Sequence, residues 1–364
     1  MKNKLAYMMI AVFLAANIFG CSNTNQTVGT QSGGQQETEA LKVVTTLFYQ
    51  YDFTKQIVGD NMEIELLLRP SQESHSYEPT PADIIAIHEA DIFIYNGGAS
   101  ELWIEKVLED VEGVHAVRMM DYVDIVEEET VEGMEDNHGH GSDDHGYDDD
   151  EHKHDDDEHG HDDDDHRHDD DEHGHDNDDH RHDDDDHEHD DDEHIWTSPV
   201  NAMTLVQALI DEFSEIDSEN KETYETNGVS YIAQLKELDQ EFREVMEQAV
   251  RTTLVFGDRF PLRYFVDEYE LDYFAAFPGC STETEPGMGT ITFLTDKIKK
   301  EGIPVVYHLE LSNEKIADTL CEGTGASKRM FHTAHNVTKE EFARGVTYVD
   351  IMRGNVESLK AGVK

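Results

Sequence analysis

Residues 252–277, TTLVFGDRFPLRYFVDEYELDYFAAF, decide the fold class of this chain. Thr252–Phe256 and Tyr273–Phe277 are short apolar runs of strand length, and Leu262–Glu270 between them has the apolar spacing of a helix. A strand, a helix and a second strand in this order predict a βαβ unit, in which the two strands are parallel.

The same alternation extends through the rest of the chain. The other predicted strands are Lys42–Leu47, Met62–Leu68, Asp91–Tyr95, Val114–Met119, Pro304–Leu309 and Lys328–Phe331. The other predicted helices are one that ends near Gly59, then 79–90, Leu102–Glu109, Val200–Phe213, Ile291–Glu301, Glu314–Glu322 and Lys339–Leu359. This pattern predicts an α/β fold with two βα lobes, each built on a parallel sheet.

One longer helix is expected to join the two lobes. Asn220–Val250 places Tyr231, Leu235, Leu238 and Phe242 on a single apolar stripe. The predicted organisation is an N-terminal lobe at 41–134 that is completed by 194–218, a linking helix at 219–250 and a C-terminal lobe at 251–364.

An acidic, histidine-rich tract at 135–193 interrupts the first lobe. From His138 to His194 a histidine stands at every seventh position, and Asp or Glu fills nearly all the space between. Because the tract has almost no apolar side chains to bury, we expect a disordered loop. Imidazole and carboxylate groups are ligands of divalent metals, which predicts low-affinity binding at many sites. The alternative is a solvated acidic linker in which the histidines are incidental.

The histidines of this predicted metal-binding loop are His138, His140, His145, His152, His154, His159, His161, His166, His168, His173, His175, His180, His182, His187 and His189. The whole chain has a formal net charge of −56, and it therefore repels the phosphate backbone of nucleic acids. Nucleic acid is excluded as a partner, and cations are the natural ones.

The first residues have the pattern of an export signal. Lys2 and Lys4 precede an apolar run, Leu5–Phe19, that is too short for a comfortable membrane span. Gly20 before Cys21 resembles a bacterial lipoprotein cleavage site, which predicts a signal peptide at 1–20 and a lipid anchor on Cys21. The polar segment 21–40 is then a flexible tether, and the protein sits on the outer face of the cytoplasmic membrane. A plain secretory signal is the alternative, and no other run is long and apolar enough to cross a bilayer.

Cys280 and Cys321 are the two remaining cysteines. In an exported protein they could form a disulfide, which would stabilise the fold by about 3–4 kcal/mol on the chain-entropy model. Two free, buried thiols are an equally good interpretation.

Metal-capable side chains outside the tract gather where predicted strands end. Ligands of open α/β sheets bind at the carboxyl ends of the strands, so we expect these side chains to meet in a cleft between the lobes. The predicted metal ligands are His75, His194, Asp258 and His335. Further candidates, either as ligands or as residues that orient ligands, are Glu310, His332 and His308.

Two of these residues have competing structural interpretations. Asp258 could instead pair with Arg259 or cap the helix that follows. Asn336 could cap the last helix, which would leave the neighbouring His335 without a role in metal binding.

Several motifs together resemble one family, the metal-binding lipoproteins of zinc and manganese ABC importers. These motifs are SHSYEPTP at Ser74–Pro81, HIWTSP at His194–Pro199, ETYETN at Glu222–Asn227 and GVTYVDIM at Gly345–Met352. The resemblance covers nearly all of residues 41–364, and a histidine-rich loop at this place is typical of the zinc branch.

The resemblance implies one metal ion held between two lobes, with His75 and His194 as its first two ligands. The family usually has His or Glu just after the first strand of the second lobe, but here that position is Gly257. Either Asp258 replaces this ligand, or three protein groups and a water complete the site. The manganese branch has a carboxylate near where His332 and His335 stand, so their imidazoles favour Zn²⁺ over Mn²⁺.

The implied function is that of a monomeric, extracytoplasmic binding protein that captures zinc and delivers it to an ABC permease driven by its ATPase. Three rival functions remain: manganese import on the same fold, a surface metal reservoir or adhesin that works through the tract, and a metallohydrolase. The hydrolase is disfavoured because the chain has no HExxH motif.

Overall fold

The strands of each half pair in parallel, as the βαβ pattern predicts. The computed structural model describes residues 40–73, 76–134, 191–279 and 286–364, all within one unit, Ala40–Lys364. The signal peptide, the tether, nearly all of the tract, His75 and Cys280 lie outside the described residues.

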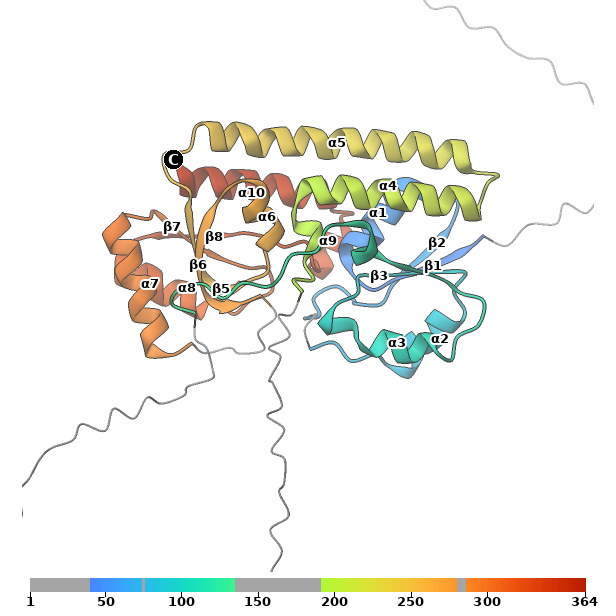
Figure 1. The fold of residues 1–364 in the computed structure, drawn as a ribbon, viewed down its shortest axis with the longest axis horizontal. Coiled ribbons are helices and arrows are strands. Elements are labelled where there is room, and N and C mark those ends of the chain that lie inside the picture. Colours follow the sequence, from blue (N-terminus) through green and yellow to red (C-terminus); the bar gives the residue numbers. More distant parts are fainter. Residues whose placement is uncertain (1–39, 74–75, 135–190, 280–285) are drawn as a thin grey trace, which may run out of the picture. The chain divides into compact units, whose positions relative to one another are not determined.

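Each lobe contains one parallel sheet of four strands in the described part of the chain (Figure 1). The first sheet has the order β2-β1-β3-β4, and its strands are β1 Lys42–Thr45, β2 Glu63–Leu66, β3 Ile92–Tyr95 and β4 His115–Arg118. The second has the order β6-β5-β7-β8, and its strands are β5 Thr253–Phe260, β6 Asp272–Pro278, β7 Val305–His308 and β8 Ser327–Met330. The predicted fold class is confirmed. The strand order reverses between β1 and β3 in the first sheet and between β5 and β7 in the second.

The helices of the first lobe and the link are α1 Phe48–Val58, α2 Pro81–His88, α3 Trp103–Leu108, α4 Pro199–Ile216 and α5 Lys221–Glu247. Those of the second lobe are α6 Arg263–Glu268, α7 Met288–Glu301, α8 Lys315–Thr324, α9 Lys339–Ala343 and α10 Tyr348–Val363. No described helix combines the length and the apolar character that a membrane span requires.

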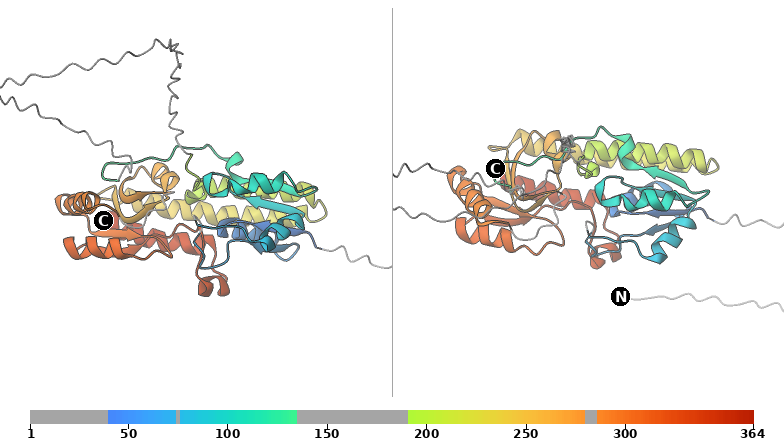
Figure 2. Two further views of the ribbon diagram at one scale, coloured as in Figure 1. Left: turned by 90° about the horizontal axis from the view of Figure 1, so that it is seen from below. Right: turned by 60° about the horizontal axis from the view of Figure 1, so that its bottom comes forward.

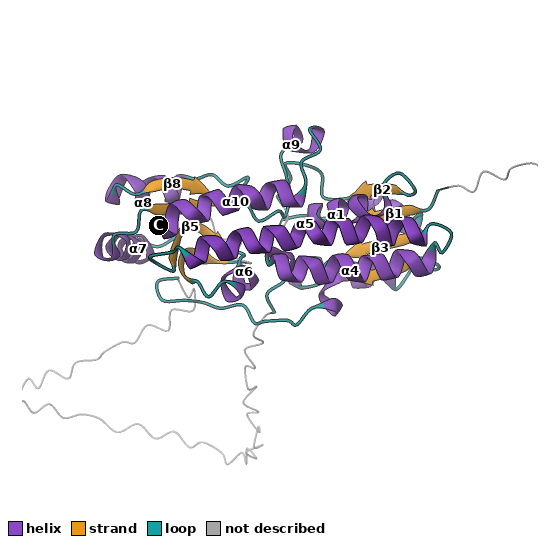
Figure 3. Cartoon of the chain, turned by 90° about the horizontal axis from the view of Figure 1, so that it is seen from above, coloured by secondary structure: helices purple, strands orange, loops and turns teal. Residues whose placement is uncertain are grey.

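One hydrophobic core runs under both sheets. Neighbouring residues of a strand face opposite sides of its sheet, so Val43 and Phe256 join this shared core while Val44 and Val255 face the separate outer core of their own lobe. The long helix α5 lies with α4 and α10 on the shared side (Figures 1 and 3). At 1.5 Å per residue α5 is about 40 Å long, which is enough to lie along both lobes.

The apolar stripe predicted for the linking helix is buried. Tyr231, Leu235, Leu238 and Phe242 are each no more than 2% exposed. Because they pack in the core that both lobes share, the helix cannot act as a free tether between two independent domains.

The last predicted helix, Lys339–Leu359, is divided in two. Gly345 adopts a left-handed backbone conformation (φ 69°) after α9 ends, and the Thr347 side chain then accepts a hydrogen bond from Asp350 N to start α10. Glycine enters this conformation without the steric cost that other residues pay, and Thr is a favoured N-cap.

The chain crosses from the first lobe onto the second before it enters the tract (Figures 1 and 2). Val126 N donates to Tyr264 Oη at 3.3 Å, and Tyr273 Oη donates to the carbonyl of Glu129 at 3.3 Å. When the described chain resumes, Tyr264 Oη donates to the carbonyl of Asp192 at 2.8 Å. Tyr264 therefore contacts the chain both ahead of the tract, at Val126, and at the end of the tract, at Asp192.

Asp192 and Glu193 differ from their predicted state. The sequence assigned them to the disordered loop at 135–193, but they are 1% and 2% exposed. Their composition matches that of the tract, and their contacts with the folded part distinguish them. Asp192 contacts Tyr264, Val126 and His194, and Glu193 contacts the loop after β3.

β5 continues past its predicted end at Phe256, with an irregularity at Gly257 and Asp258. The pairing with β6 advances from Phe256 opposite Ala275 to Arg259 opposite Phe277, so β5 has one extra residue there. A Cβ on Gly257 would lie 2.6 Å from the backbone nitrogen and Cα of Ala317 in α8. The position at which the resemblance implies a His or Glu ligand therefore has no room for any side chain in this protein.

Replacing Gly257 with Ala should lower the free energy of unfolding by about 1–3 kcal/mol, because the new methyl group overlaps backbone atoms of α8. Gly354→Ala in α10 is the matched control, since its Cβ would have no neighbour within 4 Å. Urea unfolding should show a lower free energy of unfolding for Gly257→Ala. For Gly354→Ala it should show a free energy of unfolding that is higher by up to about 1 kcal/mol. Equal stability of Gly257→Ala and the unaltered protein would contradict the packing described here.

Glu101 is a buried carboxyl group at the end of the turn after β3. It is 6% exposed, and its Oε2 accepts a hydrogen bond from Gly97 N at 2.7 Å. Burial raises its pKa from the ordinary 4.5 to about 7. The negative charge of Glu193 also raises the pKa, while hydrogen bonds from Thr46 and Gly97 lower it. The folded state therefore binds this proton more tightly than the unfolded chain does, and stability falls as the pH rises from 4.5 to 7.

Glu101→Gln should therefore stabilise the protein at pH 8 and have little effect at pH 5. One pKa unit corresponds to about 1.4 kcal/mol, so the gain at pH 8 is at most roughly 3 kcal/mol. Thermal unfolding at the two pH values measures it, and Glu105→Gln, an exposed position on α3, is the control. A gain of the same size at both pH values would show that the charge of Glu101 is not the cause.

Candidate metal centre

His194 is fully buried where the chain re-enters the fold from the tract. Its backbone N and its ring Nδ1 both contact Asp192 Oδ1, at 2.8 and 3.0 Å. A carboxylate only accepts hydrogen bonds, so Nδ1 carries the proton and Nε2 has the lone pair that a metal needs. Burial by itself lowers the pKa of His194, but the charge and hydrogen bond of Asp192, with the charges of Glu193 and Glu128, raise it above the ordinary value.

His335 comes from the second lobe and meets His194. The two ring centroids are 5.6 Å apart, and the rings are nearly perpendicular. His335 is 7% exposed, and its ring also lies 4.9 Å from that of Trp196. The Trp196 indole Nε1 donates to the carbonyl of Thr333 at 2.8 Å, so one tryptophan of the first lobe contacts both the imidazole of His335 and the backbone beside it.

A pocket between the lobes, here called the interlobe pocket, contains three of the predicted residues: Asp258, Glu310 and His335. Its other lining residues are Gln72, Glu73, Arg259, Pro261, Gly279, Leu309, Leu311, Ser312, Thr333 and Asn336. Gln72 and Glu73 come from the first lobe and the rest from the second.

Asp258 lies inside the strand irregularity, not after the strand as predicted. Its Oδ2 accepts a hydrogen bond from Leu309 N at 3.0 Å, and its Oδ1 accepts one from Arg259 N at 2.9 Å. Among the described residues, the Arg259 guanidinium pairs with Glu73 at 3.1 Å, and its backbone N is the group that contacts Asp258. Asp258 does not cap α6, which begins after Leu262 without a side-chain cap.

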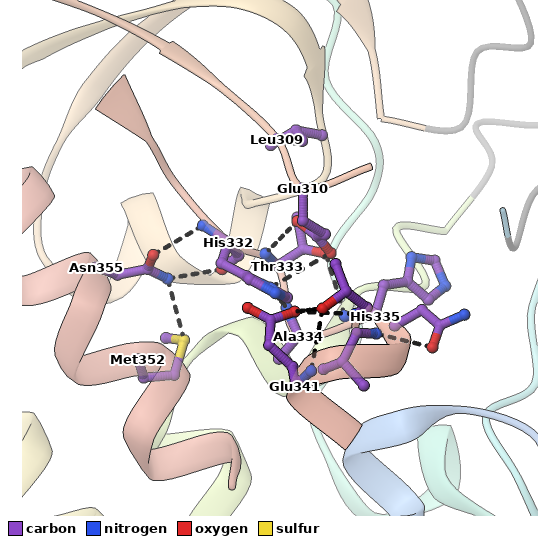
Figure 4. A network of polar contacts seen from close by, with 12 residues as sticks. Leu309, Glu310, His332, Thr333, Ala334, His335, Glu341, Met352 and Asn355 are labelled. Carbon is purple, nitrogen blue, oxygen red and sulfur yellow. Dashed lines mark hydrogen bonds and ion pairs between the residues drawn. The ribbon is translucent and has the colours of Figure 1, made fainter. Parts of the chain in front are cut away.

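Glu310 supports the loop that carries His335 (Figure 4). Its Oε2 accepts a hydrogen bond from Thr333 N at 2.8 Å, and its Oε1 accepts one from the Thr333 hydroxyl. The oxygen of that hydroxyl in turn accepts a hydrogen bond from His335 N at 3.2 Å. These bonds engage both carboxylate oxygens, which fits a residue that orients a ligand.

His332 lies beside Glu310, with 3.5 Å between its Nδ1 and Glu310 Oε1. His332 Nδ1 accepts a hydrogen bond from Ala334 N at 2.9 Å, and Asn355 binds its backbone N and carbonyl (Figure 4). His308 Nδ1 donates to the carbonyl of Leu309 at 3.0 Å. Neither residue lines the interlobe pocket.

The described residues alone contain no group of three or more His, Cys, Asp or Glu side chains arranged to hold a metal ion. His75, the remaining predicted ligand, lies outside them. Glu73 is described two residues earlier, and it lines the interlobe pocket and pairs with Arg259 across the lobes. Both partners are partly exposed, so this pair contributes little to stability.

Sequence reasoning missed Asp192 and Trp196 as residues of this site. Asp192 could not be found, because it is one of many similar aspartates before a histidine in the tract. Trp196 was detectable as the start of the apolar re-entry, but its bond to Thr333 depends on the tertiary structure. The interpretation of Asn336 as a helix cap is wrong, since Thr338 caps α9 and accepts from Glu341 N.

Cys321 is a partly buried free thiol in the structure, and burial raises its pKa. Its suggested partner Cys280 lies outside the described residues. Both interpretations of the two cysteines therefore stay predictions.

Comparison with known proteins identifies the family. Residues 43–362 match the family described as zinc-uptake complex component A, periplasmic. The chain is 30% identical over 354 residues to the high-affinity zinc uptake system protein ZnuA of Bacillus subtilis, covering 97% of this chain and 95% of that protein. It is 27% identical to the zinc-binding lipoprotein AdcA of Streptococcus pneumoniae, of which it spans 60%.

Solved structures agree with this result. The Zn(II)-bound ZnuA-like domain of Streptococcus pneumoniae AdcA superimposes with a TM-score of 0.65 at 25% identity, covering 89% of this chain and 99% of that one. The metal-dependent lipoprotein YcdH of Bacillus subtilis gives 0.66 at 28% identity, covering 89% and 100%. The relatives named for zinc uptake and zinc binding are transport proteins and not enzymes, and they favour zinc over manganese. The chain therefore belongs to the family of periplasmic zinc-uptake complex component A proteins, which confirms the predicted two-lobed zinc-binding protein of an uptake system.

Proposed function

We propose that His75, His194, His335 and Asp258 bind one Zn²⁺ ion between the lobes, and that the protein delivers this ion to an ABC permease and its ATPase. The observation that carries the proposal is the meeting of His194 and His335. These two buried imidazoles come from different lobes, their centroids are 5.6 Å apart, and one of them lines the interlobe pocket with Asp258. Three nitrogens and one oxygen form a ligand set that suits tetrahedral zinc.

The environment of His194 supports its role as a ligand. Metal-bound histidines usually donate their second ring nitrogen to a carboxylate or a carbonyl, and Asp192 provides this partner at 3.0 Å. Glu310 supports His335 less directly, through Thr333. The preference of imidazole-rich sites for zinc over manganese agrees with the zinc-binding relatives.

Further parts of the proposal concern residues outside the described structure. A lipid on Cys21 would hold a monomeric protein on the outer face of the cytoplasmic membrane through the tether at 21–40. The histidines of the tract would bind metal weakly and raise its concentration near the interlobe pocket.

Replacing His194 or His335 with Ala should lower zinc affinity by more than about 100-fold, since loss of outer-shell groups alone costs 10–100-fold. Calorimetry on the full-length protein, with a chelator that keeps weaker sites empty, measures this change. His88→Ala, an exposed position on α2, is the control and should bind zinc normally. A retained tight, stoichiometric site in both variants would refute the ligand assignment.

Deleting residues 138–189 should separate the role of the tract from that of the pocket. We expect the deleted protein to support growth in zinc-poor medium, because the high-affinity site lies between the lobes. His75→Ala in the complete chain should not support growth. The reverse pattern would favour a reservoir or adhesin that works through the tract.

A further inference from the structure

The loop that follows β8 carries His335 in the second lobe, yet its backbone is bonded to the first lobe. Phe48 N donates to the carbonyl of His335 at 3.2 Å, and Ser71 N donates to the carbonyl of Val337 at 2.8 Å. On the other side of the loop, Trp196 Nε1 donates to the carbonyl of Thr333 at 2.8 Å. Through these contacts the loop is attached to the lobe that contains His194.

Asn336 makes the most specific of these attachments. Its Nδ2 donates to the carbonyl of Arg69 at 2.9 Å and to that of Gln72 at 2.8 Å, and its Oδ1 accepts from Val337 N at 2.8 Å. The side chain is 2% exposed, so water cannot replace these partners. Among uncharged side chains only an amide offers two hydrogens to two carbonyls while it accepts a third bond.

The two carbonyls belong to a tight turn of the first lobe. Gln72 N donates to the carbonyl of Arg69 at 3.0 Å, and the Gln72 side chain accepts from Arg69 N at 2.8 Å. Ser71 within the turn has a left-handed backbone conformation (φ 70°), which is unfavourable for serine. A turn with this conformation needs contacts from outside, and the Asn336 amide contacts both of its ends.

We propose that Asn336 is a positioning residue for zinc binding. By bonding the His335 loop to the Arg69–Gln72 turn, it holds the His335 imidazole at its separation from His194. The inference rests on the proposed function, because it takes His194 and His335 as zinc ligands. Asn336 itself does not touch the metal.

The test compares Asn336→Asp and Asn336→Ala with Asn227→Asp in the full-length protein. The aspartate replaces the two donors with an oxygen that repels the Arg69 and Gln72 carbonyls. The alanine removes the donors and also the oxygen that accepts from Val337 N. Asn227 is the matched control, since its Nδ2 also donates to a backbone carbonyl of another element, that of Ile57 at 3.0 Å. It is not among the residues that line the interlobe pocket.

Zinc affinity should fall roughly 10–100-fold in both Asn336 variants, as for other groups that orient a ligand, and stay unchanged in Asn227→Asp. The visible absorption of Co²⁺ bound in place of zinc should also change in the Asn336 variants, because a displaced imidazole alters the coordination geometry. Thermal unfolding of the metal-free proteins separates the loss of zinc affinity from a loss of stability. Asn227→Asp should also lower the stability, but it should leave the zinc affinity unchanged.

Wild-type affinity and an unaltered Co²⁺ spectrum in Asn336→Ala would overturn the inference while leaving the ligand assignment intact. Tight zinc binding by both His194→Ala and His335→Ala would instead overturn the proposed function. Hydrogen exchange of the unaltered protein provides a check that needs no variant. Zinc should slow exchange in the Arg69–Gln72 turn and in the His335 loop together, and protection of only one of them would also overturn the inference.

Discussion

The shared hydrophobic core is the constraint on which the rest of the structure depends. One face of each sheet contributes to it, as do α4, α5 and α10. Both sheets are covered by the same helices. A change in the angle between the lobes would therefore expose apolar surface, with a free-energy cost of about 25 cal/mol for each Å² exposed. The shared core therefore holds the two lobes, and the interlobe pocket between them, in one arrangement.

Polar contacts inside this core select one packing arrangement. Asp52 in α1 is buried, and its Oδ2 accepts from Tyr231 Oη in α5 at 2.7 Å and from Tyr348 N at the start of α10 at 2.9 Å. Burial raises the pKa of Asp52, although its hydrogen bonds oppose this rise. Tyr348 Oη then donates to the carbonyl of Trp196 at 2.7 Å. A continuous set of contacts thus joins the linking helix to the residues around His194 and His335.

We expect this arrangement to allow metal release through small movements. The His335 loop is bonded to the first lobe at several points, while Asp258 is held by Leu309 N within the second sheet. A partner that shifts the second sheet slightly would move the carboxylate relative to the imidazoles without breaking the shared core. Small, local rearrangements of this kind are a recognised alternative to hinge closure.

The sequence by itself determined the α/β class, the order of the elements and the buried stripe of α5, because hydrophobic periodicity is a local property. It also proposed the metal ligands, from the positions where strands end. Only the tertiary structure decided that Asp192 belongs to the fold and not to the tract, that Gly257 has no room for a ligand and that Asn336 bonds to Arg69 and Gln72. Each of these facts depends on residues far apart in the chain meeting at close range. A contact of that kind leaves no periodic pattern in the sequence, so only packing can show it.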